Sequence, residues 1–385
     1  MALPGLESFD VAMQWVLDKW SVPGASLVVA KDDRLLLAHG YGFANKEGNE
    51  LVQPTSLFRL GSLTKTITAV AILQLVEQGK LTLDDKVLPL LGEIGPRPEA
   101  ISDSRVTDIT VRNLLQHSGG WDRDVSGDAV FMPYALQATM RQKGPLPPDC
   151  PTVMRDYLER TLDFSPGQRY AYSNLGYCIL GRIIERVTGK EFTTVARKSV
   201  LEPAGASRLQ WGRTLTRATG EVTYYDYPGA PLPQAMPGVA VGPVPRPYGA
   251  YSLEAMDSYG SIIGAPIDYL RFMLAIDGRG AAALLNAASV KEMNRRPSFA
   301  RGPVFYGLGV DVRQVAAGLN IWHSGSQDGV EALALRNADG TSWVVAFNTR
   351  PKDSGAFVHD FDTVLHTAAA NVRRWPSGNL FDQFR

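Results

Sequence analysis

The residues with the clearest potential for chemistry are a serine and a lysine three positions apart, in Ser62-Leu63-Thr64-Lys65. A serine hydroxyl is a weak nucleophile at neutral pH, so it needs a nearby group that takes its proton. Residues three apart lie on one face of a helix, and the apolar run that follows predicts a buried helix here. Burial would lower the pKa of Lys65 and let it act as a base. The pair therefore predicts nucleophilic catalysis.

The same residues also have a simpler interpretation. A serine in front of an apolar run is commonly an N-cap, and a short motif alone is only a hypothesis. However, Ser62 is the only serine in the chain that is followed by lysine at this spacing. The first turn of a helix also offers free N–H groups, which would stabilise an oxyanion beside Ser62.

A second candidate group is Tyr172-Ser173-Asn174, at the start of a segment with helical spacing that ends at a glycine. A lysine ammonium nearby would favour the charged form of Tyr172, which could then exchange protons with Ser62. Asn174 offers a donor and an acceptor to a substrate amide. The alternative is a buried tyrosine and an asparagine that caps the helix.

The third group is His323-Ser324-Gly325-Ser326, which follows a strand-like run. Glycine there would allow a substrate backbone to approach the edge of a strand. The N–H groups of Ser62 and Ser326 could then form an oxyanion hole. The same string occurs as His117-Ser118-Gly119 after a helical pattern, where we expect it to cap that helix.

Composition and charge exclude several classes of protein. The chain has 39 Lys plus Arg and 39 Asp plus Glu, so no net field attracts nucleic acid or an anionic membrane. No apolar stretch is long enough to span a bilayer. The first residues lack a signal-peptide pattern, which predicts a cytoplasmic protein unless a secretion signal has been removed. The histidine and cysteine spacings predict no metal, and no motif predicts another cofactor. The oligomeric state is not indicated.

Two cysteines do not suggest a fold built on disulfides. We expect Cys178 to be a small buried apolar residue in a helix and Cys150 to lie in a Pro-rich loop.

The secondary-structure pattern changes twice along the chain. Helical spacing over Phe9–Trp20 precedes two apolar runs, Ala25–Ala30 and Leu35–Tyr41, which read as paired strands. Helical signals dominate residues 62–276, with Pro/Gly-rich interruptions near 144–151 and 228–251. Strand character then returns over Tyr306–Val312, Leu319–Trp322, Val330–Arg336 and Ser342–Asn348. A last helix is expected over Val358–Arg373.

These elements predict an α/β (α+β) fold with one antiparallel sheet built from both chain ends and flanked by the terminal helices. A helical lobe is inserted between the two ends. We expect a single domain over residues 8–373, with an α/β lobe from about 8–60 and 295–373 and a helical lobe from about 61–294. A cleft is expected where the lobes meet.

In this order, the three groups resemble the motifs of the penicillin-recognising serine hydrolases. These include class C β-lactamases, D-Ala-D-Ala carboxypeptidases, D-aminopeptidases and β-lactamase-like esterases. The likeness extends from about Phe9 to Arg373 and implies the two-lobed β-lactamase-like fold. The roles it implies are Ser62 as acylated nucleophile, Lys65 and Tyr172 as proton-transfer pair, Asn174 as ligand of a substrate amide, and His323 as the group facing the leaving side. Which of Lys65 and Tyr172 is the base stays open.

The chain departs from the family pattern where β-lactamases usually carry Lys-Thr-Gly and this sequence has His323-Ser324-Gly325. A histidine is only partly charged near neutrality, so efficient penicillin hydrolysis is not expected. The bulky Tyr259, in a turn that usually holds small residues, would narrow the pocket. Loops 122–151 and 225–251 either line the cleft or cover the surface, and their candidate aromatic contacts are Trp121, Tyr134 and Tyr227.

The sequence thus predicts a serine hydrolase that forms an acyl-enzyme on Ser62 and hydrolyses small carboxylic esters or peptide-like amides. The expected substrate-binding residues are Asn174, His323, Ser324, Gly325 and Ser326. Two alternatives stay open: an acyltransferase that uses the same intermediate, and a slowly acylating penicillin-binding or sensing protein.

Overall fold

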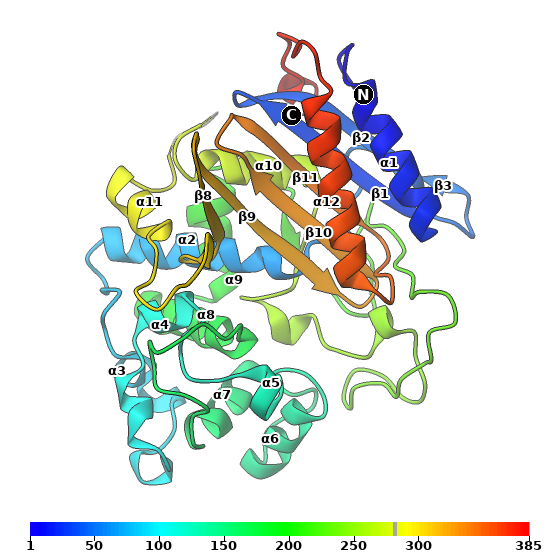
Figure 1. Cartoon of the computed structure of the whole chain (residues 1–385). Coiled ribbons are helices and arrows are strands. Elements are labelled where there is room, and N and C mark those ends of the chain that lie inside the picture. Colours follow the sequence, from blue (N-terminus) through cyan, green and yellow to red (C-terminus); the bar gives the residue numbers. More distant parts are fainter. Residues whose placement is uncertain (280–282, 385) are drawn as a thin grey trace.

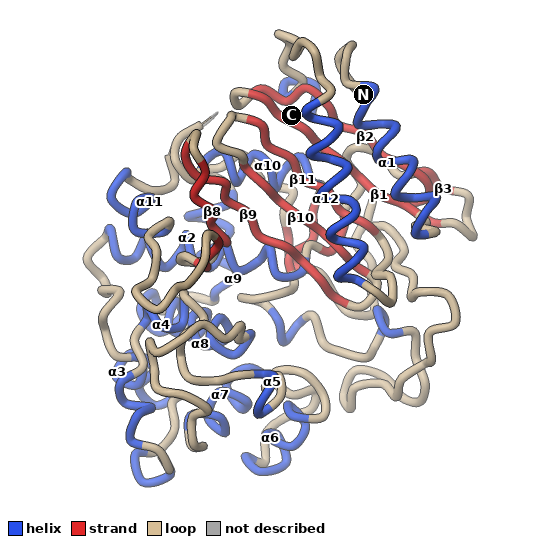
Figure 2. Tube along the Cα trace, viewed as in Figure 1, coloured by secondary structure: helices blue, strands red, loops and turns tan. Residues whose placement is uncertain are grey.

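The computed structural model describes residues 1–279 and 283–384. Within them, the larger sheet has the strand order β3-β2-β1-β11-β10-β9-β8-β7, and its neighbouring strands are antiparallel (Figures 1 and 2). Its strands are β1 (Gly24–Lys31), β2 (Arg34–Asn45), β3 (Glu50–Leu51), β7 (Val304–Tyr306), β8 (Asp311–Val315), β9 (Gly318–Gln327), β10 (Val330–Arg336) and β11 (Thr341–Phe347). Because β1 pairs with β11, the two chain ends share one sheet, which confirms the predicted fold class.

Strand β1 is buried on both faces, which explains its continuous apolar sequence. Leu27 and Val29 pack with α1 (Glu7–Trp20) and α12 (Ser354–Ala370), which Figure 1 shows side by side across one face of the sheet. Val28 joins the core on the other face. Successive side chains along a strand point to opposite faces of the sheet, which produces this division.

The remaining helices come from the middle of the chain. They are α2 (Thr64–Glu77), α3 (Val87–Leu91), α4 (Val111–Leu115), α5 (Arg123–Ser126), α6 (Tyr134–Gln142), α7 (Cys150–Leu158), α8 (Asn174–Thr188), α9 (Phe192–Ala196), α10 (Pro266–Ala275) and α11 (Ala287–Met293). A small sheet has the order β4-β6-β5, from β4 (Phe58–Arg59), β6 (Ile262–Gly264) and β5 (Gln210–Trp211). Throughout the described ranges, no helix combines the length and apolarity that crossing a membrane requires.

Helix α2 is buried almost all round, so its polar residues need internal partners. The Thr66 hydroxyl donates to the Gly309 carbonyl at 2.8 Å, and the Thr68 hydroxyl donates to the Ser258 carbonyl at 2.6 Å. These bonds fix α2 against the segments that surround the candidate site.

The expected strand Tyr306–Val312 is wrong as a single element. The chain forms two strands there, β7 and β8, joined by a turn that contains Gly309 at φ +82°. A Cβ at Gly309 would lie 2.4 Å from the Ala69 side chain, so the turn packs tightly on α2. Helix α12 begins at Ser354, earlier than expected, because the Asp353 side chain accepts a hydrogen bond from the Ala356 N–H.

Cys178 is a buried residue of α8, which confirms that expectation, but the expectation that Cys150 lies in a loop is wrong. Cys150 is the first residue of α7, and it forms a disulfide with Cys178 of α8. Their Cα atoms lie 5.9 Å apart, a usual separation for a disulfide. The sequence alone did not predict the bond, because the two cysteines meet only when α7 packs against α8, and no local pattern predicts that packing. The bond ties α8, the helix that begins at Asn174, to the start of α7.

Replacing both cysteines, by Cys150→Ser and Cys178→Ala, should lower the free energy of unfolding by about 3 kcal/mol. The bond closes a loop across 28 positions, and such a constraint on the unfolded chain is worth about that much. Urea unfolding followed by circular dichroism measures the change, and the wild type in reducing agent should match the variant. Equal midpoints for oxidised wild type and variant would contradict the prediction.

Candidate active site

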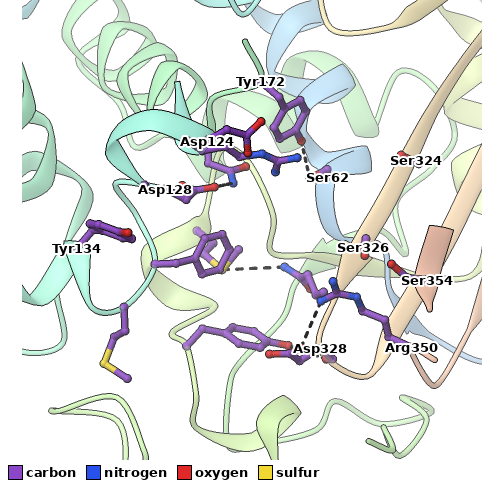
Figure 3. Close-up of a pocket in the computed structure, with 18 of the residues that line it drawn as sticks. Ser62, Asp124, Asp128, Tyr134, Tyr172, Ser324, Ser326, Asp328, Arg350 and Ser354 are labelled. Atoms are coloured by element: carbon purple, nitrogen blue, oxygen red, sulfur yellow. Dashed lines mark hydrogen bonds and ion pairs between the residues drawn. The ribbon is translucent and has the colours of Figure 1, made fainter. Parts of the chain in front are cut away.

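Ser62 lies in a short 3₁₀ turn, Gly61–Leu63, that runs directly into α2. Its side chain is partly exposed, whereas Lys65 is fully buried. Lys65 Nζ donates to Ser62 Oγ at 2.9 Å. The Tyr172 hydroxyl donates to the same oxygen at 2.8 Å, and Figure 3 marks this bond with a dashed line. The structure thus brings three predicted residues together at one oxygen atom, although 110 positions separate Tyr172 from Ser62.

The surroundings of Lys65 favour its uncharged form. Burial lowers the pKa of Lys65 well below its usual value; Asp128 opposes this shift and Arg123 adds to it. The Nζ atom also donates to the Tyr259 carbonyl at 2.8 Å. No carboxylate in the described part of the chain forms an ion pair with Lys65. An uncharged amine next to Ser62 Oγ can accept a proton.

Tyr172 is held in its neutral form, so the expectation that Lys65 would favour the charged phenolate is wrong. Burial raises the pKa of Tyr172, and the hydrogen bond to Ser62 only partly offsets that effect. The expectation assumed a lysine ammonium beside the ring, but burial removes the charge that would have produced the effect.

The His117 ring packs against the Tyr172 ring, a contact that the interpretation of His117 as a helix cap did not predict. Its ring lies 4.2 Å from the Tyr172 ring, centroid to centroid, and its Nδ1 accepts a hydrogen bond from the Ser173 N–H at 3.1 Å. Burial lowers the pKa of His117 well below its usual value, so the ring is neutral. The available signal was the string His117-Ser118-Gly119, which repeats the string His323-Ser324-Gly325.

Asn174 is the first residue of α8 and is bound by an acidic residue that sequence reasoning did not single out. Its Nδ2 donates to Asp128 Oδ2 at 2.8 Å, and Asp128, Ser62 and Tyr172 all line the pocket drawn in Figure 3. Burial raises the pKa of Asp128. The bond fixes the Asn174 amide, with its carbonyl oxygen left to accept. The only signal for Asp128 was its place in a loop expected to line the cleft.

His323 lies on β9 and is neutral, so its expected partial charge is wrong. Burial and the nearby Lys65 lower the pKa of His323 to about 3. Its Nε2 shares a hydrogen bond with the Tyr306 hydroxyl at 2.9 Å, and its Nδ1 lies 2.6 Å from the Ser324 carbonyl. Because that carbonyl can only accept, Nδ1 carries the proton and Nε2 accepts from Tyr306.

Gly325 allows β9 to approach the nucleophile turn. A Cβ at Gly325 would lie 2.0 Å from the Leu60 carbonyl oxygen, so no other residue fits without a backbone shift. Strand β8 pairs with β9 only as far as Trp322, which leaves residues 323–327 paired with β10 alone among the described strands. The strand edge that was expected at these residues is therefore present. Gly325, however, makes room for the backbone of Leu60 in the same chain and not for a substrate backbone.

Gly325→Ala should lower the free energy of unfolding by about 1–3 kcal/mol, because overpacking a close backbone contact costs that much. It should also reduce turnover by about tenfold or more, since a small displacement of β9 misaligns the site. Gly355→Ala is a matched control, because the nearest atom to its added Cβ lies 3.8 Å away. Urea unfolding and esterase assays measure both effects, and wild-type behaviour of Gly325→Ala would contradict the prediction.

Ser324 and Ser326 both line the cavity beside Ser62. The Ser326 hydroxyl donates to Glu331 Oε1 on β10 at 2.7 Å, and burial raises the pKa of Glu331 to about 7. Arg350 reaches Glu331 Oε1 at 3.6 Å. The hydrogen bond to Glu331 therefore fixes the Ser326 side chain against the sheet, although Ser326 as a whole is exposed to solvent at the cavity wall.

The cavity has a volume of about 1060 Å³ and is lined by Ser62, Tyr172, Asn174 and His323, among others. Tyr134 lines it as well, whereas Trp121 and Tyr227 are not among its lining residues. The expectation that Tyr259 narrows the pocket is wrong. Its ring is buried beside Lys65, and its carbonyl is the group that serves the site.

A model of the Beta-lactamase family matches residues 12–367. The chain belongs to this family. The match covers nearly all of the chain and confirms the resemblance drawn from the three motifs.

Two groups of curated proteins are similar to parts of the chain. It is 38% identical over 149 residues to the probable fimbrial assembly protein FimD, serogroup H1, of Dichelobacter nodosus, covering 39% of this chain and 34% of that protein. It is 25% identical over 253 residues to Protein flp of Staphylococcus aureus strain N315, covering 66% of this chain and 48% of that protein. The matched part of the chain thus spans about a third to a half of the length of these relatives.

Several solved structures share the fold. The D-amino acid amidase of Ochrobactrum anthropi SV3 has a TM-score of 0.70 at 22% identity, over 95% of this chain and 99% of that one. EstCE1, described as a hydrolase with promiscuous acyltransferase activity, has a TM-score of 0.71 at 19% identity, over 94% and 98% of the two chains. At these identities the likeness shows the fold.

Proposed function

We propose that the protein is a serine hydrolase that forms an acyl-enzyme on Ser62 and hydrolyses small carboxylic esters or peptide-like amides. The observation that carries this proposal is the position of Ser62 Oγ, which contacts Lys65 Nζ and the Tyr172 hydroxyl and also borders the large cavity. A nucleophile with proton-transfer groups in contact and an open approach for substrate meets the geometric requirements of acyl transfer.

In this proposal, Ser62 Oγ attacks the substrate carbonyl carbon while its proton passes to the uncharged Lys65. Tyr172, which is neutral, donates its proton to the leaving oxygen or nitrogen, and the Lys65 ammonium formed in the first step then returns a proton to the Tyr172 phenolate. Water then attacks the acyl-enzyme, with the proton transfers reversed. The opposite pKa shifts of Lys65 and Tyr172 support lysine as the base that first activates Ser62.

The negative oxygen of the tetrahedral intermediate would be bound by the backbone N–H groups of Ser62 and Ser326. A Cβ added at Gly61, the residue before Ser62, would lie 3.2 Å from the Ser326 nitrogen, which supports this pairing. Asn174, fixed by Asp128, would accept from or donate to an amide of the acyl group. The neutral His323 supplies no cation for a penicillin carboxylate, which supports ester or amide substrates over penicillins.

Acyl transfer to an alcohol or amine is a second outcome of the same intermediate. The open cavity supports it, since an acceptor other than water can enter, and EstCE1 is described as having that activity. Product analysis with added alcohols separates transfer from hydrolysis.

The compartment is part of the proposal. A disulfide between Cys150 and Cys178 supports residence in an oxidising compartment, since cytosolic proteins rarely keep such bonds. This observation counts against the cytoplasmic location expected from the sequence.

The test is a comparison of rates on p-nitrophenyl butyrate, a D-alanyl p-nitroanilide and nitrocefin, with Ser62→Ala as the blank. We expect hydrolysis of the ester or the anilide that depends on Ser62, and slow turnover of nitrocefin. Turnover that is undiminished in Ser62→Ala would overturn the proposal. A stable adduct without turnover would favour a sensing protein.

A further inference from the structure

Among the described residues, the cavity contains one partly buried carboxylate that has no hydrogen-bond or ion-pair partner, Asp311. Asp311 is the first residue of β8 and lines the same cavity as Ser62 and His323. Its side chain is partly buried, and burial raises its pKa to about 7. Within residues 1–279 and 283–384, its carboxylate forms no hydrogen bond or ion pair. A bound ligand is therefore the remaining source of a countercharge.

The other carboxylates of the cavity are accounted for. Three have partners: Asp122 binds Arg169 at 2.7 Å, Asp328 binds Arg350 at 3.3 Å, and Asp128 binds Asn174 at 2.8 Å. Asp124 is exposed, so water can solvate it. Arg123 is also exposed, with its guanidinium 5.1 Å from the Tyr172 ring centroid. Asp311 is thus the carboxylate on which a ligand cation would have the largest effect.

Asp311 lies near His323, the residue that is expected to face the leaving group of the substrate. It pairs with Trp322 across the β8–β9 ladder, so it lies beside the strand position that holds His323. Where the related β-lactamases have the lysine of Lys-Thr-Gly, this chain therefore has a neutral imidazole and a neighbouring carboxylate. The charge at this wall is reversed in sign, which would repel an anionic leaving group and attract a cationic one.

From this reversal we infer that Asp311 selects substrates whose leaving group carries an ammonium ion. Tyr170, which also lines the cavity and is 44% exposed, offers an aromatic face to the same ligand. Aromatic faces and carboxylates are the groups that proteins use to bind ammonium ions. The inference rests on the proposed function, because it names the substrate class of that site.

The test uses two butyrate esters of the same shape: butyrylcholine, whose ammonium is permanently charged, and 3,3-dimethylbutyl butyrate, its neutral analogue. We expect wild-type kcat/KM to be about tenfold or more higher for the choline ester. Asp311→Asn should remove this preference, mainly through KM, while changing kcat/KM for the neutral ester by less than about twofold. Asp124→Asn is the matched control and should keep the wild-type preference.

The outcomes separate this inference from the proposed function. Hydrolysis of both esters at equal rates, unchanged in Asp311→Asn, would overturn the inference and leave Ser62 catalysis standing. Loss of the preference in Asp124→Asn instead would also overturn it. If neither ester is turned over, the anilide assay decides the proposed function, and calorimetric titration with choline still decides the inference. We then expect binding to wild type that is about tenfold weaker in Asp311→Asn, and equal binding would contradict it.

Discussion

Lys65→Met should reduce turnover of a p-nitrophenyl ester by about a thousandfold or more, because it removes the group that takes the proton from Ser62. Methionine fills a similar volume, and Lys65 is buried without an ion-pair partner among the described residues, so the fold should survive the change. Steady-state kinetics measures the loss, and thermal unfolding verifies that the variant is folded. Lys190→Met, on an exposed residue, is the control.

The pH dependence gives the same prediction a second readout. Lysine acts as a base only when unprotonated, and burial lowers its pKa in the folded protein. On acidification, the value of kcat/KM should therefore fall only when the pH drops below this lowered pKa, well below the range in which a free lysine titrates. A decline that begins near pH 10, where free lysine titrates, would contradict the assignment. So would a folded Lys65→Met variant with wild-type rates.

Tyr172→Phe should reduce turnover of an anilide or an alkyl ester by about a hundredfold or more, because it removes the proton donor for the leaving group. The loss should be smaller for a p-nitrophenyl ester, because nitrophenolate leaves without a proton. The ring is retained, so its contact with His117 is kept. Initial rates on the two kinds of substrate measure the difference.

Tyr227→Phe, on a tyrosine outside the cavity lining, is the matched control and should behave as wild type. An equal loss on both kinds of substrate would indicate that Tyr172 only positions Ser62. Unchanged rates on both would remove it from the mechanism.

The sequence predicts the local part of the site well. Ser62 and Lys65 meet because helical spacing alone places them on one face, and the strands of the sheet follow from apolar runs and turn residues. Tyr172 is a candidate because its phenol could exchange protons with Ser62, and the order of the three motifs supports it. No local rule, however, places residues that far apart in contact. The division of the chain into two lobes at the stated residues stays a prediction.

The residues that sequence reasoning missed depend on tertiary packing. His117 lies against Tyr172, and Asp128 binds Asn174, only because separate loops converge there. The protonation states of Tyr172 and His323 were wrong for the same reason, since burial controls both pKa values and the depth of a side chain depends on the whole fold.

The central claim is that Ser62 is the acylated nucleophile, and intact-mass analysis after reaction with a fluorophosphonate tests it most directly. We expect a single adduct on the wild-type protein, mapped by peptide sequencing to Ser62, and none on a folded Ser62→Ala variant. An adduct of equal yield on Ser62→Ala, or one mapped to another residue, would contradict the account.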